Sequence, residues 1–204
     1  MVNVRNNSVY RFLNSLRECG SWVKRGYAAP SPHFIKQACL LRNGFPGATW
    51  IETGTFLGQT TQLLARNATH VYSIEPEIRL YKRANKLFRG AKNIKIINGT
   101  SEDVFPELLP IISGNVNFWL GGHYSAGITF KGPKETPIID EITHIGRNIN
   151  RYQKVCVLID DIRCFNPRLP EYRSYPSLET LVEWARKYQL DWHIEHDIFI
   201  AKSI

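Results

Sequence analysis

The sequence lacks long apolar runs. None of its 204 residues belongs to a stretch of about 18 consecutive apolar residues, the length at which a helix can span a membrane. The basic N-terminal stretch MVNVRNNSVYRFLNSL also lacks the continuous apolar segment and the small-residue cleavage site of a secretory signal. We therefore expect no membrane span and a cytoplasmic protein.

Cysteine is scarce and widely spaced. The four cysteines are Cys19, Cys39, Cys156 and Cys164; none forms a C-x-x-C pair, and no histidines accompany them at zinc-ligand spacing. This pattern predicts neither a disulfide framework nor a zinc site. We expect reduced thiols that pack as small apolar side chains.

The chain has a net charge of +8, and acidic residues are scarce in two of its segments. Residues 1–48 hold seven Lys and Arg against Glu18 alone, and residues 78–95 hold seven with no acid, so the rest of the chain is acidic overall. On the second segment, Arg79, Lys82, Arg83 and Lys86 have the spacing of one helix face. The basic segments suit an anionic partner such as RNA, or they are a solvated basic surface.

The N-terminal residues predict a helical extension. The spacing of Val9, Phe12, Leu13 and Leu16 is that of one helix face, and we expect this helix to end at Gly20. A turn-rich stretch, YAAPSPH, precedes a short apolar helix around residues 34–41. We predict an extension over 1–46 and one domain over 47–204.

The remainder predicts an α/β fold with a mostly parallel sheet. Short apolar runs at 48–52, 70–75, 94–98, 116–120 and 154–160 alternate with helical stretches, as buried parallel strands do. After a last helix near 177–189, two strands follow almost without a connection around Asp197. So short a connection requires an antiparallel hairpin.

Candidate ligand-binding residues follow the first two predicted strands. The turn in IETGTFLGQTT does not match the G-x-G-x-x-G pyrophosphate motif, and Glu52 beside it suits a cationic ligand better than a phosphate. Glu75, in VYSIEPE, lies about 20 residues beyond the turn, where an acid can accept both hydroxyls of a ribose.

These motifs, followed by NGTSEDVFPELL, resemble those of class I S-adenosylmethionine (SAM)-dependent methyltransferases, and the terminal hairpin resembles theirs too. The resemblance implies a Rossmann-like sheet of order 3-2-1-4-5-7-6. It also implies that Glu52, Gly54 and Gly58 line the methionine part of SAM, that Glu75 holds the ribose and that Ser101 and Glu102 lie near the adenine. The full predicted cofactor set is Glu52, Thr53, Gly54, Thr55, Gly58, Thr60, Glu75, Pro76, Ser101 and Glu102.

The ends of the fourth and fifth strands predict the catalytic side of the site. VLIDDIRCF places Asp160 and Asp161 after the fifth strand, and FWLGGHYSAG offers His123 after the fourth. This pairing is similar to that of macrocin-type, metal-dependent O-methyltransferases, which have an acid where this chain has Gly121. We predict His123 and Asp160 as catalytic residues, with Asp160 and Asp161 binding Mg²⁺ or Ca²⁺ only weakly.

The sequence therefore predicts a SAM-dependent methyltransferase that methylates an oxygen of a small-molecule or sugar-like substrate. The alternatives are an RNA methyltransferase, a SAM-binding module without turnover because of Gly121, and, more remotely, a nicotinamide-binding protein. Residues 125–137 are a candidate substrate lid. The N-terminal helices are expected to cover the site and to contribute contacts to a homodimer.

Overall fold

A computed structural model of the protein describes residues 8–122 and 136–204, with residues 8–11 described by their backbone only. Within these ranges, every helix is too short or too polar to cross a membrane. His123 and most of the predicted lid segment lie outside the described residues.

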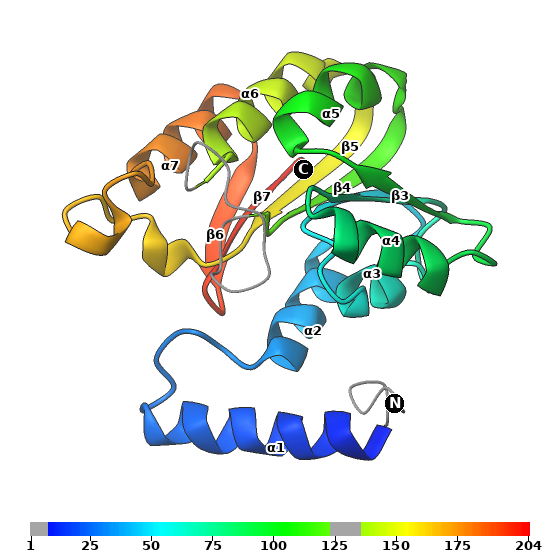
Figure 1. The fold of residues 1–204 in the computed structure, drawn as a ribbon. Coiled ribbons are helices and arrows are strands. Elements are labelled where there is room, and N and C mark those ends of the chain that lie inside the picture. Colours follow the sequence, from blue (N-terminus) through cyan, green and yellow to red (C-terminus); the bar gives the residue numbers. More distant parts are fainter. Residues whose placement is uncertain (1–7, 123–135) are drawn as a thin grey trace.

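The described chain forms one seven-stranded sheet with the order β3-β2-β1-β4-β5-β7-β6 (Figure 1), which confirms the predicted fold class and strand order. The strands are β1 (Thr49–Thr53), β2 (Val71–Glu75), β3 (Ile94–Asn98), β4 (Gly114–Leu120), β5 (Tyr152–Ile159), β6 (Asp191–Glu195) and β7 (Ile198–Lys202). The predicted strand ranges agree to within two residues at each end. The first five strands run parallel, and β7 pairs antiparallel with both β5 and β6.

The β6–β7 hairpin closes through a two-residue turn. His196 and Asp197 both have positive φ, +49° and +68°, and lie between the paired residues Glu195 and Ile198. Two successive residues with positive φ are typical of the turn whose twist matches that of antiparallel strands. This turn places Asp197 beside the segment that follows β5, where its side chain accepts a hydrogen bond from the Arg163 N–H.

Helices cover both faces of the sheet. They are α1 (Ser8–Lys24), α2 (His33–Asn43), α3 (Gln59–Leu64), α4 (Ile78–Leu87), α5 (Ser101–Leu108), α6 (Ile138–Asn148) and α7 (Leu178–Lys187), with short 3-10 turns η2 (Leu109–Ile111), η3 (Ile149–Arg151), η4 (Ile162–Cys164) and η5 (Pro170–Tyr172). In Figure 1, α5, α6 and α7 lie on one face and α2, α3 and α4 on the other, with α1 beyond α2. Such a three-layer arrangement buries both faces of a parallel sheet.

The hydrophobic core has two parts, one on each face of the sheet. The larger part joins side chains of α5, α6 and α7 to the strands, and the rings of Phe105 and Phe118 meet edge to face in it with centroids 6.3 Å apart. In the smaller part, Cys39 and Leu40 of α2 pack with Trp50 and Trp119. Cys39, Cys156 and Cys164 are buried and Cys19 is partly exposed, and all four have free thiols.

The two N-terminal helices differ in how they pack. Although α2 belongs to the core, α1 leaves Phe12, Leu13 and Leu16 more than half exposed. The prediction that α1 ends at Gly20 is wrong, because the helix continues to Lys24. A glycine inside a helix costs only about 1 kcal/mol relative to alanine, which the neighbouring turns can offset.

Candidate active site

A cavity of about 560 Å³ opens at the carboxyl ends of the parallel strands. It lies where the strand order reverses, with β1 between β2 and β4, which is where open α/β sheets bind their ligands. The strand ends form its floor, and residues of α1 and α2 form its roof. The lining comprises Asn14, Ser15, Glu18, His33, Phe34, Gln37, Gly54, Thr55, Phe56, Leu57, Gln59, Thr60, Gln62, Leu63, Arg66, Glu75, Pro76, Trp119, Gly121, Gly122, Asp160 and Asp161.

The turn between β1 and α3 brings backbone close to the cavity. Gly54 has φ +88°, and a Cβ there would lie 3.3 Å from the carbonyl oxygen of Gly121. Gly58 has φ +77°, and its Cβ would lie 2.8 Å from the Phe88 ring. Positive φ and this crowding both favour glycine. Phe56, between them, also has positive φ and faces the cavity.

Glu75 lies at the end of β2, in the cavity wall, and backbone donors fix its carboxylate. The Phe56 N–H donates to Oε2 at 2.8 Å, and the Glu77 N–H donates to Oε1 at 3.0 Å. Burial raises the pKa of Glu75, while these two N–H groups oppose the shift. Each carboxylate oxygen has a second lone pair, so the group can still accept hydroxyl hydrogen bonds from a ligand.

Glu52 lies beneath the cavity and is absent from the residues that line it, contrary to the prediction. It is 0% exposed, and its Oε2 accepts hydrogen bonds from the hydroxyls of Thr61 and Ser73, at 2.5 and 2.6 Å. No described residue hydrogen-bonds its buried Oε1. Burial raises the pKa of Glu52 to about 7, although the two hydroxyls oppose the shift. Glu52 precedes the last residue of β1, so its carboxyl lies among side chains of β2 and α3 rather than at the edge of the sheet.

The other predicted cofactor residues divide between the cavity and its surroundings. Gly54, Thr55, Thr60 and Pro76 line the cavity with Glu75. Of the described residues, Thr53, Gly58, Ser101 and Glu102 are not part of the lining. Thr53 is buried at the end of β1, and Ser101 and Glu102 form the first turn of α5, beyond the outer strand β3.

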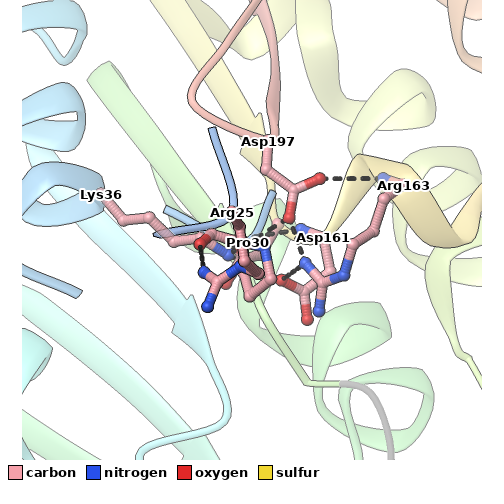
Figure 2. Close-up of polar contacts among 7 residues, drawn as sticks. Arg25, Pro30, Lys36, Asp161, Arg163 and Asp197 are labelled. Carbon is pink, nitrogen blue, oxygen red and sulfur yellow. Dashed lines mark hydrogen bonds and ion pairs between the residues drawn. The ribbon is translucent and has the colours of Figure 1, made fainter. Parts of the chain in front are cut away.

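The two predicted metal ligands are paired with protein cations instead. Figure 2 shows Asp161 with Lys36 and Arg163. The Lys36 ammonium, from α2, hydrogen-bonds Oδ1 of both Asp160 and Asp161, the second at 2.6 Å. Arg163 donates to Asp161 at 2.7 Å and also pairs with Asp197. Although burial lowers the pKa of Lys36, the two carboxylates outweigh it and raise the pKa above its usual value.

This donor set does not fit a divalent ion. A hard cation of this kind takes about six oxygen ligands. Here the Oδ1 atoms of Asp160 and Asp161 already bind an ammonium, and Gly121 adds no carboxylate. Among the described residues, no group of three His, Cys, Asp or Glu is arranged to hold a metal ion. The expectation of weak Mg²⁺ or Ca²⁺ binding therefore receives no support from the geometry.

Sequence patterns missed several residues of the site. Lys36 stands in FIKQACLL, and a lysine is ordinarily expected at the surface, yet its side chain is only 9% exposed. Trp119 reads as a strand residue, and Phe34 as a helix core residue, but both line the cavity. The signal for Lys36 was its position on an otherwise apolar face, because a lysine there needs a buried partner.

Comparison with known proteins finds likeness of structure rather than of sequence. No protein-family model matches the sequence, and the curated proteins give no match either. A SAM-dependent methyltransferase from Aquifex aeolicus aligns with a TM-score of 0.51 and 11% identity, over 82% of this chain and 88% of its own. The 23S rRNA methyltransferase ErmE aligns with a TM-score of 0.51 and 14% identity, over 83% and 66%.

A third structure, of a Streptococcus mutans protein in complex with SAH, aligns with a TM-score of 0.50 and 13% identity. The alignment covers 86% of this chain and 98% of that protein. At such low identity the likeness concerns the fold alone. The chain has the Rossmann-like fold of class I methyltransferases.

Proposed function

We propose that this protein is a SAM-dependent methyltransferase that acts on an oxygen of a small-molecule or sugar-like acceptor. The observation that carries the proposal is Glu75, a carboxylate fixed by two backbone N–H groups in the wall of a 560 Å³ cavity at the switch point of the sheet. An acid at the end of the second strand is suited to a ribose, and the glycine turn beside it lets a ligand approach the backbone.

SAM, when bound, would supply a methyl group on a cationic sulfur. The residues of this chain would bind SAM and orient it toward the acceptor. Glu75 would accept hydrogen bonds from both ribose hydroxyls, and the turn at Gly54 and Thr55 would hold the amino-acid part. Because methyl transfer is an in-line displacement, alignment of the acceptor oxygen with the methyl carbon is the main contribution that a protein makes.

The size of the cavity favours a small acceptor. Ligand sites for small molecules measure about 300–1,000 Å³, and this cavity has Phe34, Gln37 and Glu18 above the strand ends. Trp119 offers an apolar surface in the wall. An RNA acceptor would instead require the basic side of α4, where Arg79, Lys82 and Lys86 are exposed on the surface rather than in the cavity.

The acceptor oxygen must lose a proton as it is methylated, and we propose His123 as the general base. Its neighbours Gly121 and Gly122 line the cavity, and the Gly122 N–H donates to the Thr53 hydroxyl at 3.3 Å. The chain therefore passes the cavity immediately before His123. The His123→Gln variant is expected to keep SAM affinity and to lose methyl transfer.

Calorimetric titration with S-adenosylhomocysteine (SAH) tests the cofactor. We expect SAH to bind the wild type and NADH not to bind. Glu75→Gln is expected to weaken SAH binding roughly tenfold or more, because a hydrogen bond to a charged group contributes about 1.5–3 kcal/mol of binding free energy. Glu107→Gln, an exposed acid on α5, is the matched control and is expected to bind like the wild type. If SAH does not bind the folded wild type, the proposed function is wrong.

Turnover is tested with methyl-labelled SAM and two acceptor pools, hydroxylated small molecules and total RNA. We expect label in the small-molecule pool. Label in RNA, with binding that weakens steeply as salt increases, would favour the RNA alternative. SAH binding without label in either pool would favour a SAM-binding module that does not turn over.

A further inference from the structure

Five charged side chains from four parts of the chain form one ion cluster at the wall of the cavity, which Asp160 and Asp161 line. It consists of Lys36 from α2, Asp160 and Asp161 after β5, Arg163 from η4, and Asp197 from the β6–β7 turn. The Lys36 and Asp197 side chains are 9% and 1% exposed. Since lysine and aspartate are rarely so buried unless paired, the cluster is a built feature of the fold.

Lys36 occupies the centre of the carboxylate group. Its Nζ hydrogen-bonds Asp160, lies 2.6 Å from Asp161 Oδ1 and lies 3.7 Å from Asp197 Oδ2. Three carboxylates thus surround one ammonium, and Arg163 reaches two of them from the other side (Figure 2). One cation that contacts oxygens of three acids has the same electrostatic position as a bound metal ion.

Backbone geometry holds the carboxylates in place around this cation. Asp161 has φ +56°, and its N–H donates to Asp160 Oδ1 at 2.8 Å. The Arg163 N–H donates to Asp197 Oδ1 at 2.9 Å. The acids are therefore oriented by the chain ends of β5 and β7, and only Lys36 comes from the N-terminal helices.

We propose that Lys36 is a built-in cation that takes the place of a divalent ion at the Asp160–Asp161 pair. The ammonium neutralises the two acids on the acceptor side of the cavity and excludes metal ions. It also ties α2, whose His33, Phe34 and Gln37 form part of the roof, to the floor. The proposal that Lys36 excludes metal ions does not depend on SAM binding. Its relevance to methyl transfer rests on the proposed function.

The proposal predicts that removing the ammonium opens an ion site. In Lys36→Met, a side chain of similar length has no charge, so Asp160, Asp161 and Asp197 would face each other with Arg163 as their remaining partner in the cluster. Carboxylate oxygens are the ligands that Mn²⁺, Mg²⁺ and Ca²⁺ prefer, and Lys36→Met would remove the ammonium from Oδ1 of Asp160 and Asp161. The variant should therefore gain a divalent-ion site that the wild type lacks.

Mn²⁺ titration followed by electron paramagnetic resonance tests this, because bound Mn²⁺ loses its sharp free-ion signal. We expect no saturable binding to the wild type or to Lys82→Met, which removes an exposed lysine of α4. Lys36→Met is expected to bind one Mn²⁺, and adding Asp161→Asn should weaken this at least about tenfold. Ca²⁺ should raise the melting temperature of Lys36→Met and not that of the wild type.

Two results would overturn the proposal. One is stoichiometric Mn²⁺ binding to the wild type that Asp160→Asn abolishes. The other is a folded Lys36→Met that binds no more Mn²⁺ than the wild type. If Lys36→Met does not fold, either Ca²⁺ or the charge-balancing Asp161→Asn should restore folding, and failure of both would count against the proposal. SAH titration of the wild type is a separate measurement. It therefore distinguishes a failure of the cofactor proposal from a failure of the Lys36 proposal.

Discussion

Ionisation of Glu52 should oppose folding, and Glu52→Gln should remove that opposition. The carboxyl is fully buried, with hydroxyl partners on Oε2 and none among the described residues on Oε1. Its pKa is raised from 4.5 to about 7 in the folded protein. Between these values the folded protein holds a proton that the unfolded chain has released, so the free energy of unfolding falls as pH rises through this window.

The size of the effect follows from the two pKa values. Each pKa unit is worth 1.36 kcal/mol, so full ionisation of Glu52 costs the folded protein roughly 3 kcal/mol above pH 7. Below pH 4.5 the cost vanishes, because both states are protonated. Glutamine keeps the shape and can accept the Thr61 and Ser73 hydroxyl hydrogen bonds through its carbonyl oxygen.

Urea unfolding of the wild type and Glu52→Gln at pH 4.5 and pH 8 measures the effect. We expect the variant to gain up to roughly 3 kcal/mol relative to the wild type between these pH values. The melting temperature should follow by about 2–4 °C per kcal/mol. Glu183→Gln, an exposed acid of α7, should not change the pH profile. A difference between Glu52→Gln and the wild type that is the same at both pH values would refute the reasoning.

Three further predictions concern the packing around the site. Phe118→Ala should cost about 3–5 kcal/mol of unfolding free energy in urea, because the 0% exposed ring contacts Phe105 and Tyr152 in the core. Gly58→Ala should lower the free energy of unfolding by about 1 kcal/mol or more and weaken SAH binding. The reason is that φ is +77° and the new Cβ would lie 2.8 Å from the Phe88 ring. Unchanged stability would contradict this. Gly121→Asp should fold normally, since a Cβ there meets only ordinary contacts at 3.5 Å or more. It should bind Mn²⁺ only in combination with Lys36→Met, and binding by the single variant would argue against exclusion by Lys36.

The sequence alone determined the α/β class, the strands with their terminal hairpin, and the edge of the sheet at which the cavity opens. Strand positions could be predicted because buried parallel strands need continuous apolar runs, and the hairpin because a two-residue connection leaves no other pairing. Glu75 could be placed in the cavity for the same reason, since it ends a strand adjacent to the glycine turn.

Only the tertiary structure decided which strand-end acids face the cavity and what neutralises them. Glu52 and Glu75 look alike in sequence, yet Glu52 points to Thr61 and Ser73 in the core while Glu75 lines the cavity. Glu52 pairs in register with Ser73, so Glu75, as the last residue of β2, lies two residues closer to the edge of the sheet where the cavity opens. Lys36 lies 124 residues before Asp160. No local pattern joins residues so far apart, and the ion pair exists because packing of α2 on the sheet brings the ammonium to the end of β5.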